Sequence, residues 1–261
     1  MPALAPSPER DHARENRLRA ALSAANASAN VLAFHALAST MDEAHLQAEQ
    51  GAPSGTAVLA GRQTGGRGRL GRVWNSPEGG LYVSFVLRTG RPASEIPQLS
   101  LVAGLAVAET VASLVRSGVV SVKWPNDVLI DDKKVAGILI EARNNAVIIG
   151  MGINVKRSND LPDTATSLEA CGAATDTDAV FLRLATDLSR WANQWQEQGF
   201  APVHAALRPL LNGLGRMARL SAGSETIEGQ AMDIDDGGRL VIRLDSGLLR
   251  AFSIGEVSIL R

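Results

Sequence analysis

Four short β-prone segments lie close together in the middle of the chain, and they constrain the fold more than any other feature. Asp131-Asp132 and Asn144-Asn145 are turn-forming pairs that separate successive segments. Turns this short join neighbouring strands in antiparallel order. The sequence therefore predicts a meander of strands over residues 119–123, 128–130, 134–141 and 146–155.

Helical periodicity flanks this meander. Apolar spacing predicts a helix over residues 96–115, and a short helix is expected near 14–25. Thr40 with Glu43 three residues later has the capping-box spacing, so a helix is expected to begin there. A later amphipathic helix is predicted by apolar residues at steps of three and four, namely Phe181, Leu184, Leu188, Trp191 and Trp195.

The order of these segments indicates the fold class. Strands and helices mix without a regular βαβ alternation, which favours an α+β fold with a mainly antiparallel mixed sheet and helices on one side. From about Gly215, short β-prone runs are separated by turn sequences at 235–238 and 245–247, which predicts a small β-barrel. We expect an N-terminal tail at 1–28, a main domain at 29–213 and a C-terminal β domain at 214–261.

Composition excludes several classes of protein. The formal net charge is −1, so nothing global points to nucleic acid or an anionic membrane as a partner. The single cysteine, Cys171, rules out an intramolecular disulfide and fits a cytoplasmic setting. The apolar stretch 99–115 contains polar residues and is interpreted as a buried helix, and the first residues lack the pattern of a signal peptide. The four histidines are scattered and have no metal-ligand spacing.

The strongest local signal is a loop rich in arginine and glycine between Gly61 and Trp74. Its glycines allow tight turns and close approach to a ligand, and successive backbone N–H groups can form an anion-binding concavity. Its arginines are planar donors suited to carboxylate and phosphate. The loop lacks the Gly-Lys-Ser/Thr of a Walker A motif and the glycine spacing of a Rossmann turn. A polyanion such as a nucleoside triphosphate is the expected ligand.

Two alternatives remain open from the loop alone. It would also fit a flexible surface loop or a nonspecific nucleic-acid patch, although the near-neutral charge and the lack of interleaved aromatic residues count against nucleic acid. Trp74 is either a core tryptophan or a stacking platform for adenine. Four arginines in one loop repel each other, so the loop is expected to become ordered when an anion binds.

Two later segments make the pattern recognisable. Lys123-Trp124-Pro125-Asn126-Asp127 and the run from Lys134 to Glu141 follow the loop in order, and Gly150-Met151-Gly152-Ile153-Asn154 and Gly255-Glu256-Val257 come after them. With Ser39-Thr40 and Leu81 to Ser84, these pieces resemble the bacterial biotin protein ligases, which share a fold with lipoate ligases and octanoyl transferases. The resemblance spans about residues 30–261 and implies an SH3-like C-terminal domain.

The resemblance implies a two-step reaction. The carboxylate of biotin attacks the α-phosphate of ATP, giving biotinyl-adenylate and pyrophosphate, and Mg²⁺ accompanies ATP. A lysine of an acceptor, usually the biotin carboxyl carrier protein of acetyl-CoA carboxylase, then displaces AMP. Both first-step reactants are anions, so fixed cations and preorganised donors are needed.

The resemblance also assigns residues. Lys134 and Arg69 are implied as catalytic. Biotin is expected to contact Ser39, Thr40, Gln63, Gly66, Arg67, Gly68, Arg69, Tyr82, Lys134, Gly137, Gly150 and Gly152. The nucleotide is expected to contact Arg67, Arg69, Arg72, Trp74, Asn126 and Asn154. Without the resemblance, Lys134 would be interpreted as a solvent-exposed hairpin lysine, Thr40 as a helix cap, and Asn126 with Asp127 as turn formers.

Met41 departs from the family pattern, because many members have asparagine after Ser-Thr. Its thioether cannot replace the hydrogen bonds of that amide. Some relatives also carry an N-terminal winged-helix domain, and the roughly 30 residues before the first strand are too few for one. We therefore expect a ligase without sequence-specific DNA binding, and the resemblance leaves homodimerisation open.

Two rival functions remain at this point. A lipoate or octanoate ligase would share the fold and the lysine, although the complete arginine-glycine loop argues against it. A noncatalytic biotin- or nucleotide-binding module would release no pyrophosphate from ATP.

Overall fold

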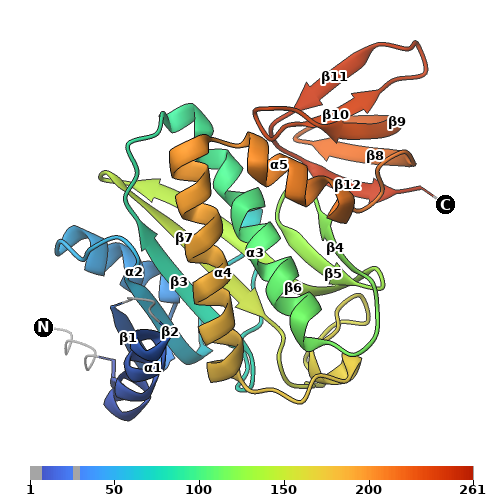
Figure 1. Cartoon of the computed structure of the whole chain (residues 1–261). Coiled ribbons are helices and arrows are strands. Elements are labelled where there is room, and N and C mark those ends of the chain that lie inside the picture. Colours follow the sequence, from blue (N-terminus) through green and yellow to red (C-terminus); the bar gives the residue numbers. More distant parts are fainter. Residues whose placement is uncertain (1–7, 26–29, 261) are drawn as a thin grey trace, which may run out of the picture.

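The computed structural model describes residues 8–25 and 30–260, which form two β-sheets and the helices that cover them (Figure 1). The helices are α1 (His12–Ala24), α2 (Thr40–Glu49), α3 (Leu99–Leu114), α4 (Thr177–Gln198) and α5 (Ala201–Leu207). The expected N-terminal tail therefore contains the helix α1. The predictions for residues 1–7 and 26–28 lie outside the described residues.

The larger sheet contains the predicted meander. Its strands are β1 (Val31–Leu37), β2 (Ala57–Gln63), β3 (Leu81–Leu87), β4 (Val120–Lys123), β5 (Asp127–Ile130), β6 (Lys133–Arg143) and β7 (Ala146–Ile153). They lie in the order β1-β2-β3-β7-β6-β5-β4. Only β1 and β2 pair in parallel, and the other neighbours are antiparallel. The expected mixed, mainly antiparallel sheet is confirmed.

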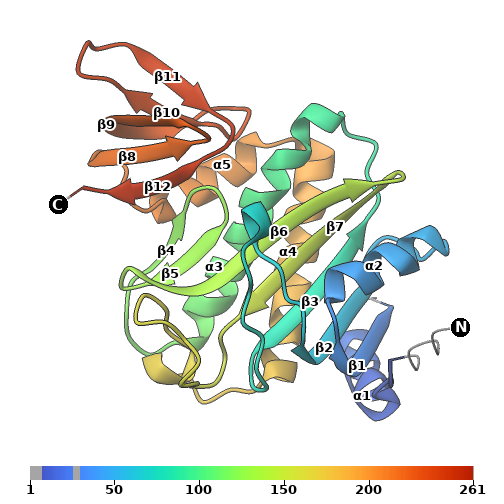
Figure 2. The same ribbon diagram turned by 180° about the vertical axis from the view of Figure 1, so that it is seen from behind.

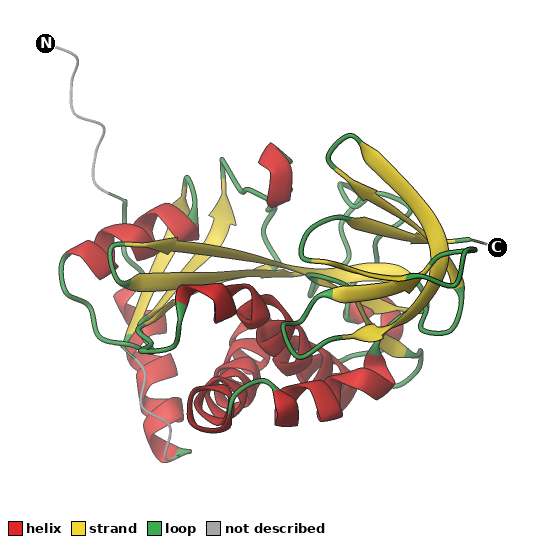
Figure 3. Cartoon of the chain, turned by 90° about the horizontal axis from the view of Figure 1, so that it is seen from above, coloured by secondary structure: helices red, strands yellow, loops and turns green. Residues whose placement is uncertain are grey.

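The two faces of this sheet are covered differently. Alternate residues of a strand point to opposite faces; in β1, Val31 and Ala33 join the large core under α3 and α4, whereas Leu32 and Phe34 join a smaller core under α2. Figure 3 shows α2 on the opposite side of the sheet from the longer helices. The prediction of helices on one side therefore holds for α1, α3 and α4, and α2 is the exception.

The cap of α2 also differs from the sequence prediction. Ser39, and not Thr40, is the N-cap residue, and its hydroxyl accepts a hydrogen bond from Met41 N–H at 3.2 Å. Thr40 begins the helix itself. This placement frees the Thr40 hydroxyl for contacts on the sheet.

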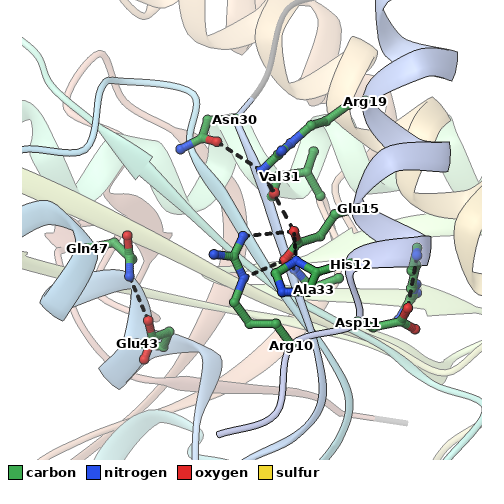
Figure 4. A network of polar contacts seen from close by, with 11 residues as sticks. Arg10, Asp11, His12, Glu15, Arg19, Asn30, Val31, Ala33, Glu43 and Gln47 are labelled. Atoms are coloured by element: carbon green, nitrogen blue, oxygen red, sulfur yellow. Dashed lines mark hydrogen bonds and ion pairs between the residues drawn. The ribbon is translucent and has the colours of Figure 1, made fainter. Parts of the chain in front are cut away.

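The outer edge of β1 is closed by the N-terminal segment (Figure 4). Asp11 N–H donates to the carbonyl of Ala33 at 2.7 Å. The buried carboxylate of Glu15 accepts from Ala33 N–H at 3.0 Å and from two Arg10 nitrogens at 2.8 Å. Unpaired strand edges invite pairing with other chains, so this network protects the edge while α1 packs its Leu18 into the core.

The C-terminal segment forms the second sheet, which lies at the upper left in Figure 2, above β4 and β5. Its strands are β8 (Met217–Ala222), β9 (Glu225–Ile234), β10 (Leu240–Arg243), β11 (Leu249–Phe252) and β12 (Glu256–Ile259). All pairings are antiparallel, in the order β11-β10-β9-β8-β12. The buried Trp124 indole donates to the carbonyl of Gly238 at 3.0 Å and joins this sheet to the larger domain.

One helix in the described part of the chain is long and apolar enough to cross a membrane by composition. It covers Ala93–Leu114, and 67% of its most apolar window is buried inside the protein. Its helix α3 packs against the sheet and beside α4, which fits the predicted buried helix.

Candidate active site

A pocket opens on the face of the large sheet that does not carry α3 and α4. Its floor is β6 and β7, its roof is the arginine-glycine loop, and its walls come from the start of α2, the turn before β5 and the start of β12. Segments from both sheets therefore meet at one cavity. The site residues expected from the sequence that line it are Ser39, Thr40, Gln63, Arg67, Gly68, Arg69, Arg72, Trp74, Asn126, Lys134, Gly137, Gly150 and Gly152.

Glycines make the floor flat. Gly137 of β6 pairs with Gly152 of β7, and Gly150 lies two residues before Gly152 on the same face. A Cβ on Gly152 would lie 2.5 Å from the indole of Trp74, and a Cβ on Gly150 would lie 2.3 Å from the Met41 sulfur. Any side chain at these positions would fill the space between floor and roof.

Polar groups gather at the α2 end of the pocket, which we define by Ser39, Thr40, Met41 and Gln63. Gln63 Oε1 accepts from Thr40 N–H at 2.7 Å, and its amide nitrogen donates to the Ser76 hydroxyl at 2.9 Å. The Thr40 hydroxyl lies 2.8 Å from the hydroxyl of Ser84 on β3. Gln63 therefore braces the roof against α2, and Ser84 fixes the Thr40 hydroxyl beside the floor.

Cations gather at the opposite, cationic end, which we define by Arg69, Arg72 and Lys134. Lys134 Nζ lies 2.7 Å from Asp127 Oδ1 and 5.1 Å from the centre of the Trp74 ring. The ammonium and the carboxylate therefore form a close ion pair inside the pocket. The backbone of Lys134 is fixed by two hydrogen bonds to a neighbouring segment: its N–H donates to Thr164 O, and its carbonyl accepts from Thr166 N–H.

Arg69 joins the roof to both domains. Its guanidinium donates to Asn126 Oδ1 at 2.9 Å and reaches the carbonyl of Gly255 at 3.4 Å. Burial lowers the pKa of Arg69, and the nearby carboxylates of Asp127 and Glu256 oppose that effect. An arginine held in this way remains a fixed cation beside Lys134.

The other loop arginines have protein partners. Arg72 pairs with Glu256 of β12, which lowers the pKa of that carboxyl group. Arg67 pairs with Asp42 on α2. Acidic and carbonyl groups of the protein therefore compensate part of the repulsion among these arginines, and ordering of the loop on anion binding stays a prediction.

Three of the expected site residues do not line the pocket. Gly66 shapes the loop instead, since a Cβ there would lie 2.4 Å from the carbonyl oxygen of Trp74. The buried Tyr82 hydroxyl donates to Pro77 O at 2.8 Å, and burial raises its pKa. The amide of Asn154 donates to Thr166 O at 3.0 Å and braces the segment beside Lys134. Their contacts are structural in this conformation.

Trp74 lines the pocket, and its role as a stacking platform for adenine stays a prediction. Its indole rests on the glycine floor, and its buried Nε1 has no hydrogen-bond partner among the described residues. The sequence singled out the residue, but its contacts with Gly137 and Gly152 depend on how the loop folds back.

Several residues in or beside the pocket were not assigned a role from the sequence. Asp127 was interpreted only as a turn former, and Glu256 only as part of a matched segment. Ser84 and Asp42 were not singled out. Ser84 had a signal, because it belongs to a matched strand and occupies a position on the same face as Tyr82. Asp42 had none, because an acidic residue in the first turn of a helix is common.

The arrangement suits a reaction between two anions. Lys134 and Arg69 supply fixed positive charge at one end, and the α2 end offers hydroxyl and amide groups beside apolar walls. Preorganised donors of this kind stabilise charge that develops in a transition state. Among residues 8–25 and 30–260, no three His, Cys, Asp or Glu side chains gather as a metal site.

Comparison with known proteins places this site in context. The model of the biotin/lipoate A/B protein ligase family matches residues 33–156, and the model of the biotin protein ligase C-terminal domain matches residues 213–260. The bifunctional ligase/repressor BirA of Bacillus subtilis is 38% identical over 236 residues, which cover 85% of this chain and 72% of that protein. The biotin--[acetyl-CoA-carboxylase] ligase of Paracoccus denitrificans is 35% identical, covering 74% of this chain and 87% of its own.

Solved structures agree with these matches. The biotin protein ligase from Aquifex aeolicus in complex with biotin and ATP superposes with a TM-score of 0.77 at 34% identity. The superposition covers 89% of this chain and 99% of that structure. The likeness therefore extends over most of this chain and nearly the whole of that structure.

Proposed function

The chain belongs to the biotin/lipoate A/B protein ligase family, and from that membership and from its pocket we propose that it is an ATP-dependent biotin protein ligase. It activates biotin as biotinyl-5′-AMP and transfers the biotinyl group to a lysine of the biotin carboxyl carrier protein of acetyl-CoA carboxylase. The relatives named for this activity support the acceptor. The observation that carries the proposal is Lys134 beside Arg69 at the end of a glycine-floored pocket.

The geometry explains how two anions are brought together. The carboxylate of biotin and the α-phosphate of ATP repel each other, and Lys134 with Arg69 offsets that repulsion where they meet. The carboxylate oxygen forms the new bond to phosphorus, and pyrophosphate leaves with the electron pair of the broken bond. Asp127 holds the Lys134 ammonium in place at 2.7 Å.

The α2 end is assigned to the ring system of biotin. A ureido group needs a few donors and acceptors, and the rest of the molecule needs apolar walls. Thr40, Gln63 and Ser39 supply the polar contacts, and Gly150 and Gly152 leave room over the floor. Gly137, Gly68 and the backbone of Arg67 complete this part, while Arg72, Trp74 and Asn126 are assigned to the nucleotide.

Gly66, Tyr82 and Asn154 support this site from outside the cavity in our proposal. Magnesium neutralises phosphate charge when it accompanies ATP. The carboxylates in the pocket, Asp127 and Glu256, are both paired with cations. The phosphates of ATP therefore hold the ion, with Asp127 as the carboxylate that lies nearest the reacting groups.

The two domains act together in this scheme. We propose a catalytic domain at 29–213 and a C-terminal domain at 214–261, which is supported by the first C-terminal strand beginning at Met217. Gly255, Glu256 and Val257 line the pocket, so the C-terminal domain contributes directly to the nucleotide side. The free Cys171 fits a reducing compartment, and we assign the reaction to the cytoplasm.

Pyrophosphate release tests the proposal. Wild-type protein with magnesium-ATP should release pyrophosphate only when biotin is added. Replacement Lys134→Ala should lower the rate by roughly 10²- to 10³-fold, the usual cost of removing one charge-stabilising donor. Lys133→Ala, which removes an exposed lysine one residue earlier, is the matched control and should retain the rate.

The outcomes separate the rival functions. Release with lipoate or octanoate and not with biotin would keep the fold and change the substrate. Absence of release with all three acids would leave a noncatalytic binding module. Incorporation of labelled biotin into purified carrier domain then tests the second step.

A further inference from the structure

A strap of ion pairs crosses the α2 end of the pocket. The arginine-glycine loop folds on itself as a hairpin, since Gly68 N–H donates to Arg72 O at 2.7 Å and Trp74 N–H to Gly66 O at 2.9 Å. We call residues 66–74 the hairpin. Its base is fixed to the chain after β1, where Gly65 N–H donates to Ala38 O at 2.8 Å.

Arg67 joins this hairpin to α2. Its Nη1 donates to Asp42 Oδ2 at 2.8 Å and its Nη2 to Asp42 Oδ1 at 2.7 Å, so both carboxylate oxygens are engaged. This paired geometry is the stronger form of an arginine–carboxylate contact. The hydrogen bonds from Arg67 lower the pKa of Asp42, which keeps the carboxylate charged.

A second carboxylate stands behind the pair. Glu141 Oε1 on β6 lies 3.8 Å from Arg67 Nη2. Glu141 is itself held by His45 Nε2 at 2.9 Å and by Arg143 at 3.3 Å. Nη1 and Nη2 of Arg67 therefore both face protein carboxylates, on α2 and β6, and are not available to a substrate anion in this conformation.

The position of Asp42 gives the contact a consequence. Asp42 follows Ser39, Thr40 and Met41, which form the α2 end of the pocket. Closing the hairpin onto Asp42 draws the roof toward the same helix turn that holds the polar contacts. Breaking the Arg67–Asp42 pair would widen the pocket at the α2 end, where the polar groups are expected to contact the ring system of biotin.

We propose that Asp42 is a positioning residue of the reaction: through Arg67 it holds the hairpin closed over the α2 end and so sets the affinity for biotin. The inference rests on the proposed function, and it changes the role of Arg67. The side chain of Arg67 holds the hairpin to Asp42, and only its backbone contributes to the biotin site. Lys134 and Arg69 bind the carboxylate of biotin and the α-phosphate of ATP.

The alternative role of Arg67, as a direct ligand of the substrate, predicts the opposite effect of Asp42→Asn on biotin binding. If Arg67 were a substrate ligand restrained by Asp42, then Asp42→Asn would free the guanidinium and tighten biotin binding. If Arg67 is a strap, Asp42→Asn weakens binding. The pair is partly exposed, with 37% of the Arg67 side chain and 55% of the Asp42 side chain accessible. We therefore expect a change of about two- to fivefold, the range for such pairs.

The experiment compares wild-type protein with Asp42→Asn, Arg67→Lys and the double variant. The control is Glu43→Gln, which removes a neighbouring carboxylate from the first turn of α2 that contacts Gln47 and not Arg67 (Figure 4). The first readout is the rate of limited trypsin cleavage after Arg69 and Arg72 in ligand-free protein, mapped by mass spectrometry. Trypsin can cleave this segment only after it has left the folded hairpin, so the cleavage rate reports how often the hairpin opens.

Cleavage should be about two- to fivefold faster in Asp42→Asn and Arg67→Lys, no faster in the double variant than in the singles, and unchanged in Glu43→Gln. Calorimetric titration should show the same factor in the dissociation constant for biotin, and Asp42→Asn, which changes a residue outside the pocket lining, should retain kcat at saturating biotin. Unchanged cleavage in Asp42→Asn, or tighter biotin binding, overturns the proposal. If wild-type protein binds no biotin, the proposed function fails, and the cleavage rates still decide whether the strap exists.

Discussion

Replacing Gly150 by alanine should damage the pocket more than the fold. The new Cβ would lie 2.3 Å from the sulfur of Met41 and 3.1 Å from its Cγ. Nonbonded heavy atoms pack at about 3.5–4.0 Å, so the thioether has to move by more than ~1 Å. Met41 is buried between α2 and the sheet, and the open space beside it is the pocket.

Both consequences reduce the room for a ligand ring. The methyl group raises the floor, and the displaced thioether enters the α2 end. Overpacking of this kind costs about 1–3 kcal/mol, although the flexible methionine side chain favours the lower part of that range for stability. The same ~1–3 kcal/mol applied to binding corresponds to about a 5- to 150-fold rise in the dissociation constant for biotin.

Titration calorimetry and urea unfolding measure the two effects separately. Gly90→Ala is the control, because a Cβ at Gly90 would have no heavy atom within 4 Å. The double variant Gly150→Ala with Met41→Ala should be more stable than the sum of the two single losses predicts, by about 0.5–3 kcal/mol, since the clash no longer exists. A dissociation constant for Gly150→Ala within twofold of wild type would refute this account of the floor.

Three further predictions concern contacts around the pocket and the termini. Asp127→Asn should lower kcat for pyrophosphate release by up to about 10²-fold, because the Lys134 ammonium loses the partner that positions it; an unchanged kcat would exclude that role. Trp124→Phe should reduce the free energy of unfolding in urea by about 0.5–1.5 kcal/mol, because the half-buried Gly238 carbonyl loses its donor. Burial opposes ionisation of Glu15, but its hydrogen bonds outweigh that effect and lower its pKa. Its stabilisation is therefore present above the unfolded-state pKa and is lost as pH falls through the folded-state pKa. Glu15→Gln should be less stable at neutral pH and flatten the acid limb of the stability curve, and a parallel shift at all pH values would contradict this.

Local patterns were enough to predict most of the secondary structure. The turn pairs Asp131-Asp132 and Asn144-Asn145 adopt positive φ between strands of the meander, as their short polar side chains allow. The heptad-like spacing from Phe181 to Trp195 lies within α4, and its apolar face is buried. These features depend on residues that are neighbours in the chain, so the sequence contains the whole cause.

The cap of α2 shows where local reasoning ends. Ser39 and Thr40 are both good N-cap residues, and the spacing to Glu43 favoured Thr40. In the structure Thr40 bonds to Ser84, forty-four positions later, and Ser39 takes the cap. A tertiary hydrogen bond thus chose between two locally acceptable helix starts.

The pocket likewise depends partly on residue identity and partly on tertiary contacts. The sequence by itself identified the chemical groups: the arginines of the loop, Lys134, and the floor glycines at 137, 150 and 152. It did not determine that Arg67 pairs with Asp42 or that Trp74 lies on the floor of the pocket. It also did not determine that the side chains of Tyr82 and Asn154 donate their hydrogen bonds to backbone carbonyls. Side-chain identity sets what a group can bind, whereas its partner depends on which distant segments the two sheets bring within hydrogen-bond distance. That distance is a property of the packed chain, and so only the tertiary structure decided it.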